Sequence, residues 1–155
     1  MTSVFKAFFK VFAAVLLLAA ALPAHAAPAA AAPSDPRMEL RTLGNPNAPV
    51  RVDEFVSLTC PHCAEFYNDT LPKLEPAYIK TGKVKFVLHD FPIDGPSLKA
   101  AALARCMPKD EYFPFIEVLY KNQAVWAYGG GNPDDHLVDY AKLGGMTGKQ
   151  ARACL

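Results

Sequence analysis

Hydrophobic positions along the chain recur with two different periods, and these periods predict the order of its elements. The run 50–58, Val-Arg-Val-Asp-Glu-Phe-Val-Ser-Leu, is apolar enough to indicate a buried central strand. Over 61–80 the apolar positions recur at helical spacing, and Pro72 and Pro76 are expected to kink that helix. Because a second apolar run follows at 84–89, the pattern predicts a strand–helix–strand unit of the α/β class.

The remainder of the chain has a helical pattern, apart from a short predicted strand over 38–43 ahead of the central one. Helices are predicted over 97–107 with Ser97 as the N-cap, from Asp110 or Glu111 onward, from Asn132-Pro133 to Gly144, and from Thr147 to the last residue. Asn132 followed by proline and two aspartates is favourable chemistry for a helix start. The pattern therefore predicts an N-terminal α/β part, 37–96, and a helical block, 97–155.

The first residues have a different pattern. Two lysines precede a 12-residue apolar run, 11–22, which is too short to span a bilayer, and Ala24-His25-Ala26 fits a small-x-small cleavage site. We interpret 1–26 as a cleaved secretory signal peptide, the alternative being an uncleaved membrane anchor. The Ala/Pro-rich stretch 27–36 is predicted to be a disordered linker. Export places the chain in a compartment where disulfides persist, the periplasm.

The most informative motif, Cys60-Pro61-His62-Cys63, lies where the central strand passes into the helix. A C-x-x-C at that junction is typical of a redox site. Cys60 is expected at the N-cap and Pro61 at the first helical position, where the lack of an N–H has no consequence. Cys63 lies one turn further on, close enough to form a disulfide with Cys60.

The position of the motif also predicts the direction of its chemistry. The first turn of a helix presents unpaired N–H groups and the positive end of the helix dipole, so a thiolate at Cys60 is stabilised. His62 would add a ring N–H or a positive charge beside that sulfur. We therefore expect Cys60 to be the nucleophile and Cys63 the more buried, resolving thiol. Because a stabilised thiolate favours the reduced form, the disulfide is expected to be an oxidant.

The Cys-Pro-His-Cys motif, preceded by Glu54-Phe55-Val56-Ser57, resembles the DsbA family of periplasmic disulfide oxidoreductases. Asp90-Phe91-Pro92 before an Ala-rich helix resembles the single-domain alphaproteobacterial branch of that family. The resemblance covers about 37–155. It implies a thioredoxin-like fold with an inserted helical block, and a redox-active disulfide in place of a cofactor. It also implies reduced or unfolded secreted proteins as substrates, and a membrane reoxidant of the DsbB type as a partner.

The resemblance has consequences for one acidic residue and for the end of the chain. Asp53 and Glu54 must face opposite sides of a strand, and Glu54 matches the family's buried acidic residue, which implies a proton relay to Cys63. The alternative is a solvent-facing or salt-bridged glutamate. The family fold also needs further strands, a closing helix and a cis-proline loop, and no proline follows Pro133. We therefore expect these C-terminal parts to be missing from this chain.

Two further cysteines, Cys106 and Cys154, lie on predicted helices of the block. If Cys60 pairs with Cys63, these two are left for each other, and we predict a structural disulfide. The alternatives are two buried free thiols or a four-cysteine zinc site. One C-x-x-C with two widely separated single cysteines is poor spacing for zinc, so no metal is expected.

Other functions are less compatible with the sequence. Without its two lysines at 6 and 10, the mature chain has 14 basic and 15 acidic side chains, and no basic patch that would indicate nucleic-acid binding. A disulfide isomerase or reductase would use the same chemistry. Such a protein would need to dimerise to hold its substrates, and no separate dimerisation domain is visible in the sequence. A thioredoxin-like module that binds copper(I) through Cys60 and Cys63, with His62 nearby, belongs to a different class. We take a thiol–disulfide oxidase as the leading hypothesis.

Overall fold

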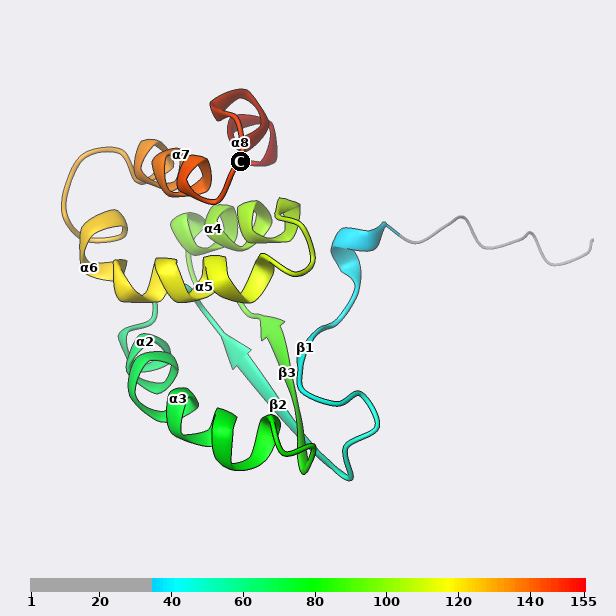
Figure 1. Cartoon of the computed structure of the whole chain (residues 1–155). Helices are drawn as coiled ribbons and strands as arrows, with labels where there is room; N and C mark the ends of the chain where they lie inside the picture. Colours follow the sequence, from blue (N-terminus) through cyan, green and yellow to red (C-terminus); the bar gives the residue numbers. More distant parts are fainter. Residues whose placement is uncertain (1–34) are drawn as a thin grey trace, which may run out of the picture. The chain divides into compact units, whose positions relative to one another are not determined.

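The computed structural model describes residues 35–155, so the predicted signal peptide and nearly all of the predicted linker lie outside the described residues. Its elements in chain order are η1 (Pro36–Met38), β1 (Arg41–Leu43), β2 (Val50–Val56), α2 (Pro61–Glu65), η2 (Phe66–Thr70), α3 (Leu71–Leu74), η3 (Glu75–Ile79), β3 (Val84–Asp90), α4 (Gly95–Cys106), α5 (Tyr112–Lys121), α6 (Gln123–Trp126), α7 (Pro133–Leu143) and α8 (Gly148–Cys154) (Figure 1). None of the helices within 35–155 is both long and apolar enough to cross a membrane.

The sheet confirms the predicted strand–helix–strand unit, but the predicted buried central strand is wrong, because β2 is a mostly exposed edge strand and β3 is central. Its order is β1-β3-β2, with β2 parallel to β3 and β1 antiparallel to β3. The parallel register runs from Val50 opposite Val84 to Val56 opposite Asp90. Both strands therefore point the same way, and the cysteine motif follows directly from the carboxyl end of β2, the end where α/β folds place their sites. Figure 1 shows α4 and α5 gathered at this end.

The helix after the motif continues through its prolines by changing its hydrogen-bond pattern. Two short α-helical segments, α2 and α3, alternate with two π-helical turns, η2 and η3. The N–H of Leu71 bonds to the carbonyl of Phe66, and that of Lys80 to Glu75, each five residues back. Proline cannot donate the usual bond four residues back, so Pro72 and Pro76 produce wider turns where the sequence predicted kinks.

Two predicted boundaries need correction. The strand predicted over 38–43 is confined to Arg41–Leu43, because Pro36–Met38 forms a 3₁₀ turn capped by the Asp35 side chain. The first long helix begins at Gly95, and its N-cap is Asp94. Ser97 is instead the third helical residue and closes a capping box with Asp94 at 2.7 Å. Ser97, predicted as the N-cap, therefore lies inside the first turn of α4.

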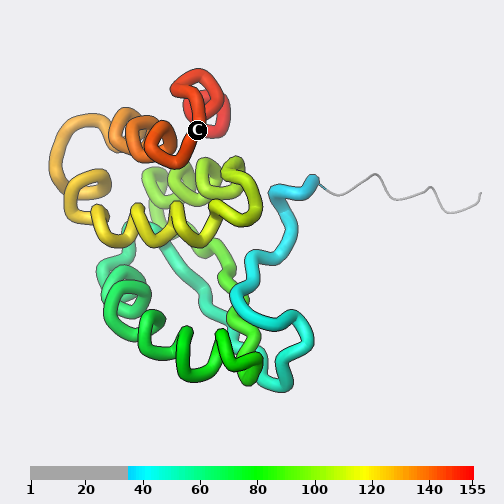
Figure 2. The backbone as a smooth tube through the Cα atoms, in the orientation of Figure 1, coloured from blue at the N-terminus to red at the C-terminus, as the bar shows by residue number. Residues whose placement is uncertain are grey.

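One buried apolar cluster joins the helix after the motif, the sheet and the helical block. Leu88 of β3, Leu103 of α4 and Leu119 of α5 are fully buried in it, as is Leu137 of α7. Trp126 of α6 is also buried and donates its indole N–H to the Leu119 carbonyl at 2.8 Å. α8 contacts both α7 and α4, so the end of the chain is part of this packing (Figure 2).

Candidate active site

Cys60 is held at the junction that the sequence predicted. It is the N-cap of α2 with an extended backbone (φ −75°, ψ 121°), and Pro61 follows at the start of the helix. The N–H of Cys60 donates to the Ser57 carbonyl at 3.0 Å, and its carbonyl accepts from Ala64 at 3.1 Å. Strand, turn and helix therefore fix the backbone on both sides of the sulfur.

The two thiols of the motif have different electrostatic surroundings. Both are half-buried and neither is in a disulfide in this structure. The backbone N–H of Cys63 is the main influence that lowers the pKa of Cys60, with smaller help from the Cys63 thiol and the His62 N–H. Burial is the main influence that raises the pKa of Cys63, and the charges of Cys60 and Glu54 add to it. The arrangement can therefore hold a thiolate at Cys60 and a protonated thiol at Cys63.

The His62 side chain reaches into solvent on the exposed side of α2. Its side chain is 93% exposed, and Nδ1 lies 3.5 Å from a carboxylate oxygen of Glu65, one turn along the helix. Its backbone N–H, not its ring, acts on Cys60 in this structure. No group of three or more His, Cys, Asp or Glu side chains within 35–155 could hold a metal ion. A role for the ring in the redox chemistry stays a proposal.

Glu54 is turned toward the protein, and Asp53 away from it. Asp53 pairs on the outer side with Arg51 at 2.6 Å and with His89 at 2.6 Å. Glu54 is half-buried, and its Oε2 is enclosed without a hydrogen-bond partner in the described residues. Burial raises its pKa from 4.5 to about 7. A carboxyl in this state can gain or lose a proton near neutral pH.

Glu54→Gln should make the dithiol protein more stable at pH 8 and leave it unchanged at pH 4. Between about pH 4.5 and 7 the folded glutamate keeps a proton that the unfolded chain releases, so wild-type stability falls as pH rises. Each pKa unit corresponds to about 1.4 kcal/mol, but solvent partly screens this half-buried carboxyl, so the gain at pH 8 should be about 1 to 2 kcal/mol. Urea unfolding across this pH range measures it.

The control for that series is Glu117→Gln, which replaces an exposed glutamate and should change stability by less than about 0.5 kcal/mol. A Glu54→Gln variant as stable as the wild type at pH 8, or less stable, would contradict the assignment of Glu54 as a buried, unpartnered carboxyl.

The helical block also holds the turn before Cys60, which the sequence did not predict. Gln123 Nε2, at the start of α6, donates to the carbonyls of Leu58 at 2.8 Å and Cys60 at 3.0 Å. Tyr128 donates its hydroxyl to the Thr59 carbonyl in a very short contact. Gln123 is only 7% exposed, so its two bonds are shielded from water. No spacing rule links 58–60 to 123–128, and only the fold brings them together.

A second set of contacts ties this turn to the start of α4. The hydroxyl of Thr59 donates to Asp94 Oδ2 at 2.7 Å, and the hydroxyl of Ser57 lies 3.1 Å from that of Thr59. Asp94 also caps α4 through Ser97. The backbone that carries Cys60 is therefore braced by two elements of the helical block.

Gln123→Met should destabilise the protein by about 1 to 3 kcal/mol. The substitution removes the buried side-chain amide, so the carbonyls of Leu58 and Cys60 lose the hydrogen bonds that this amide donates. The larger share should come from Leu58, since the Cys60 carbonyl keeps its bond from Ala64. Chemical unfolding checks this. The control is Val125→Ala, a half-exposed position on the same short helix, with an expected change below about 0.5 kcal/mol. A Gln123→Met variant as stable as this control would be evidence against the brace.

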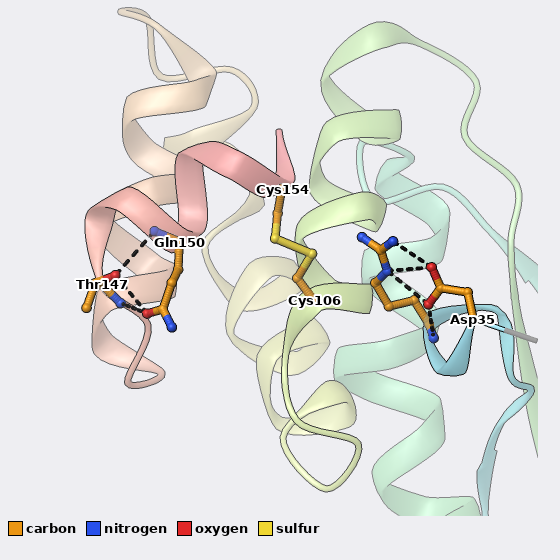
Figure 3. The surroundings of a disulfide bond; sticks show 6 residues. Asp35, Cys106, Thr147, Gln150 and Cys154 are labelled. Atoms are coloured by element: carbon orange, nitrogen blue, oxygen red, sulfur yellow. Dashed lines mark hydrogen bonds and ion pairs between the residues drawn. A yellow bond between two sulfur atoms is a disulfide. The ribbon is translucent and has the colours of Figure 1, made fainter. Parts of the chain in front are cut away.

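The remaining two cysteines are joined in the structure. Cys106, the last residue of α4, forms a disulfide with Cys154, the last residue of α8, across 48 residues of sequence. Figure 3 shows the bond connecting the two helices, with the Thr147–Gln150 capping box at the other end of α8. The disulfide therefore ties the last helix to the first helix of the block.

Known proteins share both the fold and the motif-bearing region. A family model described as thioredoxin matches residues 38–155. A Rickettsia prowazekii protein named as a protein-disulfide oxidoreductase is 35% identical over 114 residues, which are 73% of this chain and 42% of that protein. Disulfide bond formation protein D of Bacillus subtilis is 35% identical over 85 residues, 52% of this chain and 38% of that protein. The chain thus spans about two fifths of the length of these curated relatives.

Solved structures give the same result. The crystal structure of alpha-DsbA1 from Wolbachia pipientis superposes with a TM-score of 0.69 at 32% identity, covering 76% of this chain and 59% of that one. BdbD from Bacillus subtilis superposes with a TM-score of 0.66 at 28% identity, covering 74% and 64%. These matches confirm the predicted thioredoxin-like fold with a helical insertion. The chain therefore belongs to the thioredoxin-like family of DsbA-type protein-disulfide oxidoreductases.

Proposed function

We propose that this chain carries the redox centre of a thiol–disulfide oxidase that introduces disulfides into secreted proteins through Cys60 and Cys63. The observation that supports this best is the opposite direction of the two pKa shifts at the start of α2, lowered at Cys60 and raised at Cys63. A thiolate favoured at Cys60 stabilises the reduced form of the pair, and its disulfide is correspondingly more oxidising.

The proposed reaction starts from the Cys60–Cys63 disulfide. A substrate thiolate attacks Cys60 Sγ, forming a mixed disulfide while the Cys60–Cys63 bond breaks and Cys63 leaves as a thiolate. Glu54 donates its proton to Cys63, which its raised pKa allows near neutral pH. A second substrate thiolate then attacks the substrate sulfur of the mixed disulfide, and Cys60 leaves as the stabilised thiolate. Two electrons have passed from the substrate to the protein.

The cellular setting in this proposal follows from the predicted signal peptide 1–26 and from the family. The substrates are reduced or unfolded secreted proteins, the location is the periplasm, and a DsbB-type membrane protein restores the Cys60–Cys63 disulfide. The names of the relatives, protein-disulfide oxidoreductase and disulfide bond formation protein, support the reaction class. The lowered Cys60 pKa supports the oxidising direction.

The redox equilibrium with glutathione tests the direction. The chain is incubated at a series of glutathione ratios, alkylated, and its reduced fraction is measured by mass spectrometry. An oxidase should have a reduction potential between about −180 mV, the value of disulfide isomerases, and about −120 mV, the value of strong oxidants. A potential near about −270 mV, typical of thioredoxin, would reject the oxidase and leave a reductase.

A further inference from the structure

An open cavity of about 890 Å³ lies against the disulfide, apart from the residues that hold the redox motif. Its walls come from η1, the end of α4 and α8, and its lining includes Arg37, Arg41, Arg105, Lys109 and Cys154. Figure 3 looks onto this region and shows the Cys106–Cys154 bond, with Asp35 further along the same side. Four cationic side chains thus surround one open space.

Three of these four cations have carboxylate partners of their own. The pairs are Arg37 with Asp35 at 2.5 Å, Arg105 with Asp90 at 2.6 Å, and Lys109 with Glu39 at 2.7 Å. Arg105 also donates to the carbonyls of residues 37 and 39, at 3.0 and 2.6 Å. One positive charge, that of Arg41, is left over in the cluster.

Arg41 is the most enclosed of the four. Its residue is 4% exposed, and its backbone is fixed by the pairing of β1 with Leu88 of β3. The guanidinium lies 5.0 Å from the centre of the Tyr112 ring, but within 35–155 it makes no hydrogen bond or ion pair, and its Nε is buried without a partner. Arginine does not lose its proton in proteins, so this charge is permanent.

The counter-charge does not come from the segment outside the described residues. Residues 1–34 contain no aspartate or glutamate. Glu39 also lines the cavity, but its pKa is lowered mainly by Lys109 and only in a minor part by Arg41. A buried charge without a partner is strongly unfavourable, and an arginine in that state is a ready ligand for two oxygens of an anion.

We propose that this cavity is a binding site for a small anion with carboxylate or phosphate oxygens, with Arg41 as its principal ligand. The Tyr112 ring supports the guanidinium. Because the other three cations are balanced by carboxylates, the net positive charge of the cluster is that of Arg41. The site is independent of the thiol chemistry. Inorganic phosphate and succinate represent the two oxygen sources.

The test uses the whole chain with its Cys106–Cys154 disulfide intact. Calorimetric titration of the folded protein with inorganic phosphate, and separately with succinate, should give saturable binding. Arg41→Met should weaken that binding at least about tenfold. Arg41→Lys should weaken it less, because lysine keeps the positive charge but lacks the planar guanidinium that can bind two oxygens at once. Lys83→Met, which removes an exposed cation on another part of the surface, is the matched control and should bind as the wild type.

A second measurement does not depend on the heat of binding. In chloride buffer of matched ionic strength, phosphate should raise the unfolding temperature of the wild type and of Lys83→Met more than that of Arg41→Met. Comparing variants at the same phosphate concentration removes its general stabilising effect on folded proteins. Saturable binding of either anion that depends on Arg41 supports the site, and the better anion identifies the oxygen source. Absence of binding by both anions, or equal binding by Arg41→Met and the wild type, would overturn the proposal.

Discussion

Cys60→Ala should abolish disulfide transfer to a reduced peptide, whereas Cys63→Ala, whose Cys60 thiolate attacks the disulfide of an oxidised peptide and releases one peptide thiolate, should stop at a stable mixed disulfide. Cys60 has the lowered pKa and lies at the start of α2, so its sulfur is the one that a substrate attacks and later leaves. Cys63 is more enclosed and has a raised pKa, so it acts only as the partner that closes the protein's own disulfide. Removing it leaves no internal thiol to displace a substrate bound at Cys60.

Oxidation of a dithiol peptide, followed by its fluorescence or mass, measures the first effect. Non-reducing electrophoresis of Cys63→Ala after incubation with the disulfide form of the peptide measures the second. The loss for Cys60→Ala should reach the uncatalysed rate. Thr70→Ala, an exposed position at the end of η2, controls for the substitution itself and should be fully active. The assignment of roles fails if Cys60→Ala still oxidises the peptide, or if mixed disulfides accumulate on Cys63 instead.

Breaking the Cys106–Cys154 disulfide should reduce the free energy of unfolding by roughly 4 kcal/mol, as expected for a cross-link that closes a span of 48 residues. The bond is the covalent tie between α8 and α4, and α8 is a seven-residue helix with Ala151 as its fully buried residue. Such a short helix has little stability of its own. Without the disulfide, α8 should pack less firmly, and one wall of the cavity beside Arg41 should become looser.

The comparison is made in a Cys60→Ala/Cys63→Ala background, so that only one disulfide is present. Guanidinium unfolding of this protein is compared with that of the variant that also carries Cys106→Ala and Cys154→Ala. Reducing the first protein with dithiothreitol should reproduce most of the loss without any change of side chain. A difference below about 1 kcal/mol in both comparisons would show that the bond is incidental to stability.

Much of the site could be predicted because it depends on local sequence. The apolar run before Cys60, proline after it and helical spacing beyond it are enough to place the sulfur at the N-cap of α2. Alternation within a strand separates Asp53 from Glu54, and the family resemblance selects Glu54 as the enclosed one. The predicted pair of Cys106 and Cys154 agrees with the disulfide in the structure.

The rest depends on contacts between distant segments, for which the sequence carries no signal. Gln123 reaches the carbonyl of Leu58 across 65 residues, and nothing in its neighbourhood distinguishes it from a surface glutamine. Local spacing also does not fix the His62 ring: its Nδ1 lies 3.5 Å from Glu65, three residues further along the exposed helix face, and its role beside Cys60 stays a prediction. Arg41 alternates with Leu40 and Thr42, which predicts a position on the polar face of the strand, and only the fold reveals that its side chain is buried.

The central claim is that the start of α2 stabilises a thiolate at Cys60, and titration of that thiolate tests it most directly. The reduced chain, with Cys106 and Cys154 left paired, is followed by thiolate absorbance as a function of pH, and Cys63→Ala assigns the lower transition to Cys60. The account predicts a midpoint clearly below the value of free cysteine, about 8.5. A midpoint at or above that value would contradict it, because the helix terminus would then give no support to the anion on which the proposed oxidase depends.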